Sequence, residues 1–108
     1  MNETGGKVDL AGMSEIDRLI LEPARLAVLS LLHVIESADF TFLMNQTGLT
    51  WGNLSAHMSK LQEAGYVAVE KSFKGKRLNT MQRLTPSGRT AFRSYAERMR
   101  AFFSSIQD

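Results

Sequence analysis

Apolar residues recur at helical spacing along the first third of the chain, and each run is bounded by residues that start or stop helices. Residues 23–35 are apolar over most of a helix circumference, as expected for the central helix of a small domain. Pro23 suits its first turn, where a missing N–H costs nothing. A shorter helix precedes it and can be capped by Ser14. The apolar face of that shorter helix comprises Ile16, Leu19 and Ile20.

Two further helices are predicted between residues 39 and 65, joined by a turn at residues 47–49. Asp39 can cap the first of them. Thr50 can cap the second, because its hydroxyl accepts a hydrogen bond from a first-turn amide. Gly65 can end the second helix in the left-handed conformation that glycine tolerates. A short helix, a turn containing glycine and a second helix together predict a helix-turn-helix.

The second of these helices has two unlike faces. Its apolar stripe, spaced i, i+4 and i+7, comprises Leu54, Met58 and Leu61. Its outer face is rich in short side chains and comprises Gly52, Asn53, Ala56, Ser59, Lys60 and Glu63. A solvated helix face usually carries long charged side chains, whereas short ones let a helix approach another surface closely. The pattern therefore predicts a helix that enters the major groove of DNA while the preceding helix braces it.

A β-hairpin is predicted after this helix. Residues 66–73 favour a strand through the β-branched and aromatic residues Val67, Val69 and Phe73. Residues 74–76, Lys-Gly-Lys, form the turn, and residues 79–84 form the return strand. Another short extended segment is expected around Phe40. The fold class is therefore mainly α with a small β-hairpin.

A long last helix is predicted at about residues 85–106, with Thr85 as its cap and Pro86 at its first position. Its apolar residues follow a 3-4-3-4 spacing and comprise Phe92, Tyr95, Met99, Phe102 and Ile106. A helix of about 20 residues extends roughly 30 Å, which exceeds what so small a core needs. We therefore expect a second subunit to cover part of this seam; packing within the chain is the alternative. The dimerisation residues predicted are Ile16, Leu19, Tyr95, Met99, Phe102, Phe103 and Ile106.

The 108 residues suit one domain, with residues 13–108 forming it and residues 1–12 a flexible tail. No apolar run approaches the roughly 18 residues of a membrane helix, and no signal-peptide pattern is present, so a cytoplasmic protein is expected. The chain has no cysteine, and its two histidines, His33 and His57, are far apart in sequence. We expect no metal site and no cofactor, and His33 is interpreted as structural. An enzyme is not expected, because the chain has no paired acid-base residues and no phosphate-binding glycine loop.

The net charge is only +2, but the charges are unevenly distributed. Residues 70–84 carry a local balance of +4, whereas residues 1–22 carry −3. The basic residues of the hairpin are Lys71, Lys74, Lys76, Arg77 and Arg83. Such a patch is expected for a surface that binds a phosphate backbone, although a solvated turn would also contain these residues.

From Leu19 to Leu84 the chain resembles the compact winged helix-turn-helix regulators of the MarR, ArsR and PadR type. The matching segments are LEPARLAVLSLL, LTWGNLSAHMSKLQEAGYVAVEK, KGKR and LTPSGR. The resemblance implies that the hairpin is the wing and that Ser55 and His57 lie near DNA. It also implies a homodimer and a cleft between the dimer helices and the core for an unidentified small apolar effector. Ala56 departs from the family, which often has a longer base-reading residue there; alanine contacts only a thymine methyl group.

Candidate DNA contacts divide into positioning and base-reading residues. We expect Thr50, Ser55, Ser59, Lys60, Lys74, Lys76 and Arg77 to contact phosphates. Asn53 is the candidate for bidentate pairing with adenine, and His57 is a second candidate for base contact.

Four of these interpretations have alternatives. Trp51 either lies along a sugar-phosphate chain or packs on the preceding helix, and Gly52 either permits close backbone approach or has no role. Arg77 either inserts into the minor groove or pairs with Glu70 across the hairpin. The arginines of the last helix form a solvated face, although Arg89 could reach a phosphate.

The sequence therefore predicts a homodimeric transcriptional regulator, more specifically a repressor, that binds a pseudo-palindromic site in double-stranded DNA. Its two recognition helices would enter major grooves about 10 bp apart. The alternative is a winged-helix protein-interaction module whose basic wing binds an acidic partner.

Overall fold

The computed structural model describes residues 15–106, which form five helices and three strands. The side chains of residues 15 and 16 are outside this description, as are residues 1–14 with the predicted tail and the Ser14 cap. In chain order the elements are α1 (Glu15–Leu21), α2 (Pro23–Ile35), β1 (Ser37–Ala38), α3 (Phe40–Thr47), α4 (Trp51–Glu63), β2 (Val67–Lys74), β3 (Arg77–Leu84) and α5 (Pro86–Ser105).

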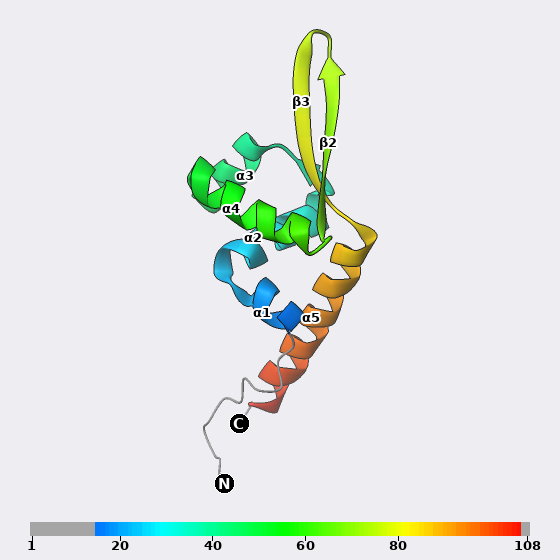
Figure 1. The fold of residues 1–108 in the computed structure, drawn as a ribbon. Helices are drawn as coiled ribbons and strands as arrows, with labels where there is room; N and C mark the ends of the chain where they lie inside the picture. The colour runs from blue at the N-terminus through cyan, green and yellow to red at the C-terminus, as the bar shows by residue number, and fades with distance from the viewer. Residues whose placement is uncertain (1–14, 107–108) are drawn as a thin grey trace.

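Three parts can be distinguished in the shape of the molecule. The helices α2, α3 and α4 form its body, with α1 packed on α2 (Figure 1). The β2–β3 hairpin projects from one side of this body, and α5 runs away on the other side, along α1 (Figure 1). We call the β2–β3 hairpin the wing. The predicted mainly α architecture with a wing and a long last helix is confirmed.

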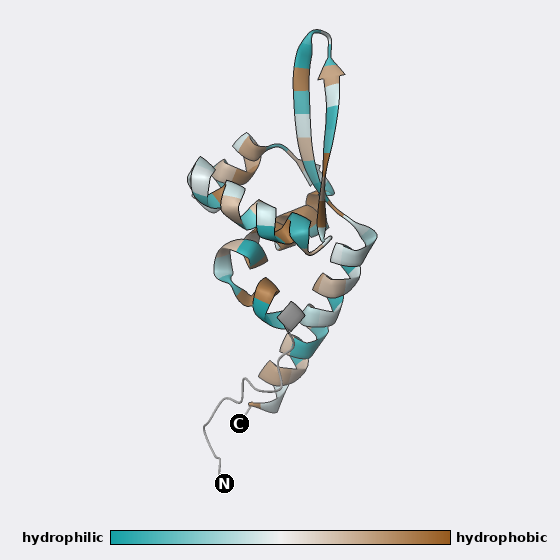
Figure 2. Ribbon diagram, viewed as in Figure 1, coloured by the Kyte–Doolittle hydropathy of each residue, from teal (hydrophilic) through white to brown (hydrophobic). Residues whose placement is uncertain are grey.

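The core lies where α2 meets α4, α5 and the base of the wing. Figure 2 shows apolar segments concentrated on α2 and at the base of the hairpin. The side chains that are fully buried come mainly from the predicted helical stripes, and they are Ile20, Val28, Leu29, Leu32, Leu43, Leu54 and Leu61. Met58, the third residue of the α4 stripe, is 2% exposed. Burial of aliphatic side chains in this way contributes about 1.5–3 kcal/mol each.

The predicted helix starts are confirmed by their capping bonds. The backbone N–H of Phe42 donates to the Asp39 carboxylate at 2.8 Å, which caps α3. The N–H of Asn53 donates to the Thr50 hydroxyl at 3.2 Å, which caps α4. At the start of α5, the N–H of Gly88 donates to the Thr85 hydroxyl at 3.0 Å. Each cap satisfies an amide that the helix itself leaves unpaired.

The sheet has three strands in the order β1-β3-β2, where the sequence predicted only the hairpin. In the added strand Ser37 pairs with Arg83 and Ala38 with Gln82. The extended segment thus precedes Asp39, and its prediction at Phe40 is wrong because Phe40 begins α3. The chain turns from α2 into β1 at Glu36. Its φ of 70° is a left-handed conformation that non-glycine residues seldom adopt. A two-residue strand carries too little alternation to be recognised from its pattern.

The wing is longer than predicted. Its strands pair in register from Val67 opposite Leu84 to Lys74 opposite Arg77. The turn is therefore the two residues Gly75 and Lys76, with Gly75 at φ 64°. Two-residue hairpin turns require positive φ, which glycine supplies without strain.

The first half of α5 packs on its own domain. Tyr95 is only 5% exposed within the single chain, so its prediction as a dimer contact is wrong. Gly88 lies against the backbone of Tyr66, and a Cβ added at Gly88 would be 2.1 Å from the Tyr66 carbonyl oxygen. The first half of α5 therefore packs within its own chain, which was the alternative to a dimer contact that the sequence left open. The second half carries Phe103 and Ile106, which are 58% and 61% exposed.

Candidate nucleic-acid interface

The stripe that buries α4 also determines which of its residues face outward. Because Leu54, Met58 and Leu61 are inserted in the core, the opposite side of the helix is solvent-exposed. The exposed residues of this side include five predicted contact residues, namely Gly52, Asn53, Ala56, Ser59 and Lys60. Ser55 is half-buried at the edge of this surface.

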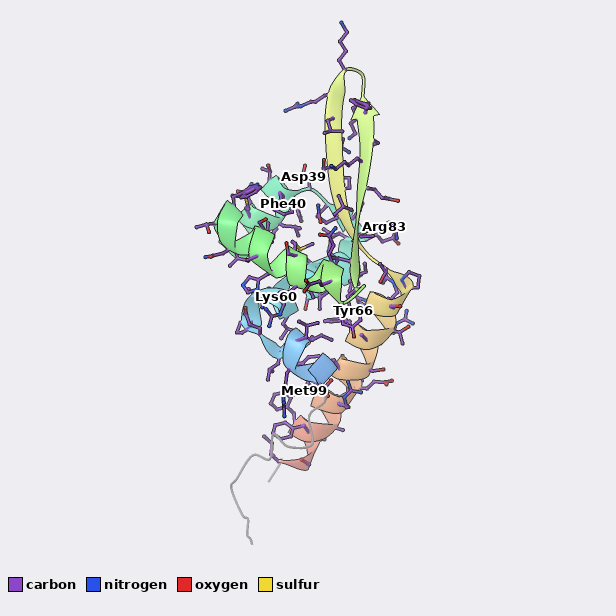
Figure 3. The ribbon with its side chains drawn as sticks, viewed as in Figure 1. Asp39, Phe40, Lys60, Tyr66, Arg83 and Met99 are labelled. Carbon is purple, nitrogen blue, oxygen red and sulfur yellow. The ribbon has the colours of Figure 1, made fainter. Side chains whose placement is uncertain are left out.

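Trp51 packs on the preceding helix and also remains exposed to solvent. Its indole ring contacts the ring of Phe40, with the centroids 5.9 Å apart, so it packs on the preceding helix. It is nevertheless 62% exposed, next to the cap residue Thr50, which is also exposed. Figure 3 places Phe40 and Asp39 where α3 begins, beside α4. The starts of α3 and α4 therefore form one edge, at which the exposed Trp51 packs on the half-buried Phe40.

His57 does not face outward. Its Nε2 lies 3.1 Å from the Glu22 carboxylate, and its Nδ1 lies 3.2 Å from a guanidinium nitrogen of Arg25. Arg25 also donates to the Leu19 carbonyl oxygen at 2.6 Å. These contacts tie α4 to the corner between α1 and α2. The structure thus gives His57 a positioning role for α4, which differs from the predicted base contact.

The wing carries unpaired cations at its tip. Lys74, Lys76 and Arg77 are exposed, and none of them pairs with a carboxylate among residues 15–106. Glu70 pairs instead with Arg83 at 3.1 Å, so the alternative of an Arg77–Glu70 pair is wrong. The predicted basic patch is therefore present at the tip and retains its charge.

A groove of about 430 Å³ joins the wing to the start of α3. It is lined by the tip cations Lys74 and Arg77 on one side and by Phe40 and Thr41 on the other. Asn79 and Thr80 of β3 provide polar side chains along it. Cations and neutral hydrogen-bonding groups in one groove suit an extended polyanion such as a nucleic-acid strand. Asp39, which caps α3, also lines the groove.

Arg98 and Arg89 of α5 form contacts with other helices of the fold. The sequence had predicted that the arginines of this helix form a solvated face. Arg98 donates to both carboxylate oxygens of Asp17, with its Nε 2.9 Å from the nearer oxygen, and this bond raises the pKa of Arg98 further. Asp17 is 4% exposed, so the pair fastens α1 to α5. Arg89 donates to the His33 carbonyl oxygen, and its guanidinium group also contacts Nδ1 of the His33 ring. These contacts leave Arg89 less free to bind a phosphate. Burial and the charge of Asp17 raise the pKa of the neighbouring Tyr95.

The described residues contain neither a candidate metal site nor a membrane span. Among residues 15–106, no group of three or more His, Cys, Asp or Glu side chains is placed to hold a metal ion. His33 stacks on Phe92, with the ring centroids 5.2 Å apart. No helix in this part of the chain is long and apolar enough to cross a membrane.

The model of the winged helix DNA-binding domain family matches residues 24–103, which include the whole helix-turn-helix and wing. The chain belongs to this family. The winged-helix chain is also 39% identical over 71 residues to an uncharacterized protein of Methanocaldococcus jannaschii, an alignment that covers 66% of this chain and 77% of the relative.

Solved structures share the winged-helix fold. A transcriptional regulator homologue from Pyrococcus horikoshii superposes with a TM-score of 0.79 at 23% identity, over 84% of this chain and 90% of that one. A MarR-family transcriptional regulator from Silicibacter pomeroyi gives 0.62 at 25% identity, over 86% of this chain and 64% of that one. NadR in complex with 4-hydroxyphenylacetate gives 0.68 at 18% identity, over 98% of this chain and 84% of NadR.

The sequence did not indicate two features of this interface. The groove beside Phe40 and Thr41 depends on β3 passing the start of α3, which no local pattern reveals. The Glu22–His57–Arg25 cluster joins His57 to residues 32 or more positions earlier in the chain.

Proposed function

We propose that this protein is a transcriptional regulator that binds double-stranded DNA in the cytoplasm. Helix α4 enters the major groove with its small outer face, and the wing follows the phosphate backbone into the adjacent minor groove. The observation that carries this proposal is that the wing cations Lys74 and Arg77 line one groove with the start of α3, where Phe40 contacts Trp51 at the start of the exposed face of α4.

The side chains of α4 indicate which residues contact bases and which contact phosphates. Asn53 is the exposed residue of α4 best suited to a bidentate base contact, while Ala56 contributes at most an apolar contact with a thymine methyl group. Thr50, Ser59 and Lys60 lie on the same exposed side and contact phosphates. Much of the affinity then comes from the wing, and sequence is read at few positions.

We further propose a homodimer that represses transcription from a pseudo-palindromic site. The exposed end of α5 supports this, because Phe103 and Ile106 would otherwise leave apolar surface in water. Met99 and Phe102 are partly buried beside them, and Figure 3 shows Met99 on the side of α5 that faces α1. Leu19 is half-buried in α1, and Ile16 lies outside the described side chains.

A small-molecule effector is a further part of the proposal. NadR, which shares the fold, was solved with 4-hydroxyphenylacetate. In this chain a hollow of about 610 Å³ lies beside α5, lined by residues that include Tyr66, Ala91 and Arg98. A ligand bound there would contact α5 and the segment between α4 and the wing together, and so could change the angle between them.

Salt titration of binding to duplex DNA tests the central claim. For the wild type, log K should fall steeply against log salt, with a slope of about 0.9 per phosphate neutralised. The K74A/R77A double variant should reduce this slope by about 2. The matched control R93A/R100A removes the same charge from exposed positions of α5 and should leave the slope unchanged.

The alternative function makes the opposite prediction. If the protein were a protein-interaction module, the wild type would bind duplex DNA weakly, and its plot of log K against log salt would have a slope near that of K74A/R77A. It would bind an acidic protein partner instead. A flat salt dependence of the wild type, or equal slopes for the wing and α5 variants, would therefore overturn the proposed function.

A further inference from the structure

Two large apolar side chains are exposed at the tip of the wing, far from the core. Phe73 of β2 is 71% exposed and Leu78 of β3 is 53% exposed. They are direct partners across the hairpin, one position before the Lys74–Arg77 pair that closes the turn. Figure 2 shows an apolar band in each strand near this tip. We call Phe73 and Leu78 the tip pair.

The tip pair lies on the face of the wing that is directed toward the body. Side chains alternate between the two faces of a strand, so Phe73 and Leu78 share a face with Val67 and Leu84. Val67 and Leu84 are buried in the core at the base of the wing. Leu78 also lines the groove shared with the start of α3. A ligand that occupies this groove therefore meets Leu78, with Phe73 directly opposite it across the hairpin.

The surroundings of the tip pair indicate a polyanion. Lys74, Lys76 and Arg77 adjoin it, and these three cations have no carboxylate partner among the described residues. An apolar partner surface would not require them, and a phosphate backbone alone would not require Phe73 and Leu78. The minor groove of DNA presents both kinds of surface, since phosphates line its edges and sugars and bases form its walls and floor.

The reach of the wing agrees with this position. Its exposed part covers residues 70–74 of β2, which at about 3.4 Å per residue extends roughly 17 Å. Adjacent major and minor grooves are separated by half a helical turn, or about 17 Å along the duplex. The exposed part of the wing is thus about as long as the separation between the two grooves.

We propose that Phe73 and Leu78 act as an apolar wedge that enters the minor groove and opens a base step there. This inference rests on the proposed function and adds a second mode of sequence selection. An apolar wedge bends the duplex by partly unstacking one step, and flexible pyrimidine–purine steps deform most easily. The protein thereby selects DNA by its deformability, which offsets the few base contacts that α4 can make around Ala56.

Stability of the hairpin alone does not account for the tip pair. A cross-strand pair contributes about 0.2–1 kcal/mol, and Thr–Thr pairs do so as well as apolar ones. Threonine also has a high strand propensity and carries no cost in water. The choice of Phe and Leu at an exposed tip therefore points to a contact outside the chain.

The test compares F73T/L78T with the wild type and with the control V34T, which changes an apolar residue of α2 that is 77% exposed and remote from the wing. Binding is measured to a duplex selected by the wild type from random sequence, across a range of salt. Bending is measured by energy transfer between dyes at the duplex ends. Hydrogen exchange of the wing amides establishes that the hairpin persists in the variant.

The wedge predicts that F73T/L78T binds at least tenfold more weakly, with the salt slope of the wild type and with a straighter duplex. It also predicts that a pyrimidine–purine step is enriched where the wing reaches and that the variant loses this preference. Equal affinity and equal bending for F73T/L78T and wild type would overturn the wedge and leave the proposed function intact. A change in self-association at unchanged DNA affinity would assign the tip pair to a second copy and would also overturn it. A wild type that binds no duplex would refute the proposed function itself.

Discussion

Replacing Gly88 by alanine should destabilise the protein. Among the glycines of the described helices, Gly88 is the one at which an added methyl group should lower the free energy of unfolding most. Gly88 lies in the first turn of α5, where this helix crosses the backbone of Tyr66. A Cβ there would lie 2.1 Å from the Tyr66 carbonyl oxygen and 2.8 Å from its carbonyl carbon. These atoms belong to the backbone, so no side-chain rotation can relieve the overlap.

The cost follows from the displacement that the methyl group requires. Carbon–oxygen contacts are normally about 3.3 Å or longer, so α5 must move by about 1 Å relative to Tyr66. Two bonds hold it in place: Thr85 N–H donates to the Tyr66 carbonyl oxygen at 3.0 Å, and the Thr85 hydroxyl donates to that of Gly65 at 2.6 Å. Overpacking costs about 1–3 kcal/mol, and each weakened bond costs about 0.5–1.5 kcal/mol. The helix propensity of alanine offsets roughly 1 kcal/mol. We expect a net loss of about 2–4 kcal/mol in the free energy of unfolding.

Urea unfolding followed by circular dichroism measures this loss. With a typical slope of about 1–3 kcal/mol per molar urea, the midpoint should fall by about 1–2 M. The matched control is Gly52→Ala in the first turn of α4, where an added Cβ meets nothing within 4 Å. That variant should keep or raise the midpoint, because alanine favours a helix over glycine. A midpoint for Gly88→Ala equal to that of Gly52→Ala would refute the packing of α5 on Tyr66.

Three further changes test other contacts. Asp17→Asn should lower the free energy of unfolding by about 1–2 kcal/mol, less than for a fully buried pair because half of the Arg98 side chain is exposed; an unchanged urea midpoint would contradict this. Burial, and then the charge of Asp17, raises the pKa of Tyr95, so the stability it contributes is complete below about pH 10 and is lost as the pH rises through its folded-state pKa. Tyr95→Phe should therefore flatten the decline of the unfolding midpoint as the pH rises above about 10, and parallel declines would show that another group causes it. His57→Ala should lower the melting temperature by several degrees, since it releases α4 from Glu22, while the salt slope of DNA binding stays unchanged; a slope smaller by about 1 would mean that His57 contacts a phosphate.

Much of the fold was predictable because the determinants are local. The caps Asp39, Thr50 and Thr85 bind amides three residues away, so each signal lies within one turn of chain. The stripe of α4 was predictable for the same reason, since helical periodicity alone brings Leu54 and Leu61 to one face.

The candidate interface was predictable in part. The outer face of α4 follows from its stripe, and the basic tip of the wing follows from a short run of charges. The position of His57 did not follow, because the residue lies on the edge of the stripe and its partners Glu22 and Arg25 lie at the start of another helix. The resemblance to related regulators gave an expectation for His57 that its contacts in this chain do not support.

The sequence by itself determined the helix-turn-helix, the wing and the excess of positive charge at its tip. Periodicity, capping and turn residues act over a few positions, and they require no knowledge of what lies opposite. Only the tertiary structure decided the contacts between distant segments: the strand β1 on β3, the Asp17–Arg98 pair that fastens α1 to α5, and the close approach of Gly88 to Tyr66. It also decided that Leu78 of the wing lies in the groove beside α3, because the face that a strand presents at its tip depends on which residues enter the core at its base.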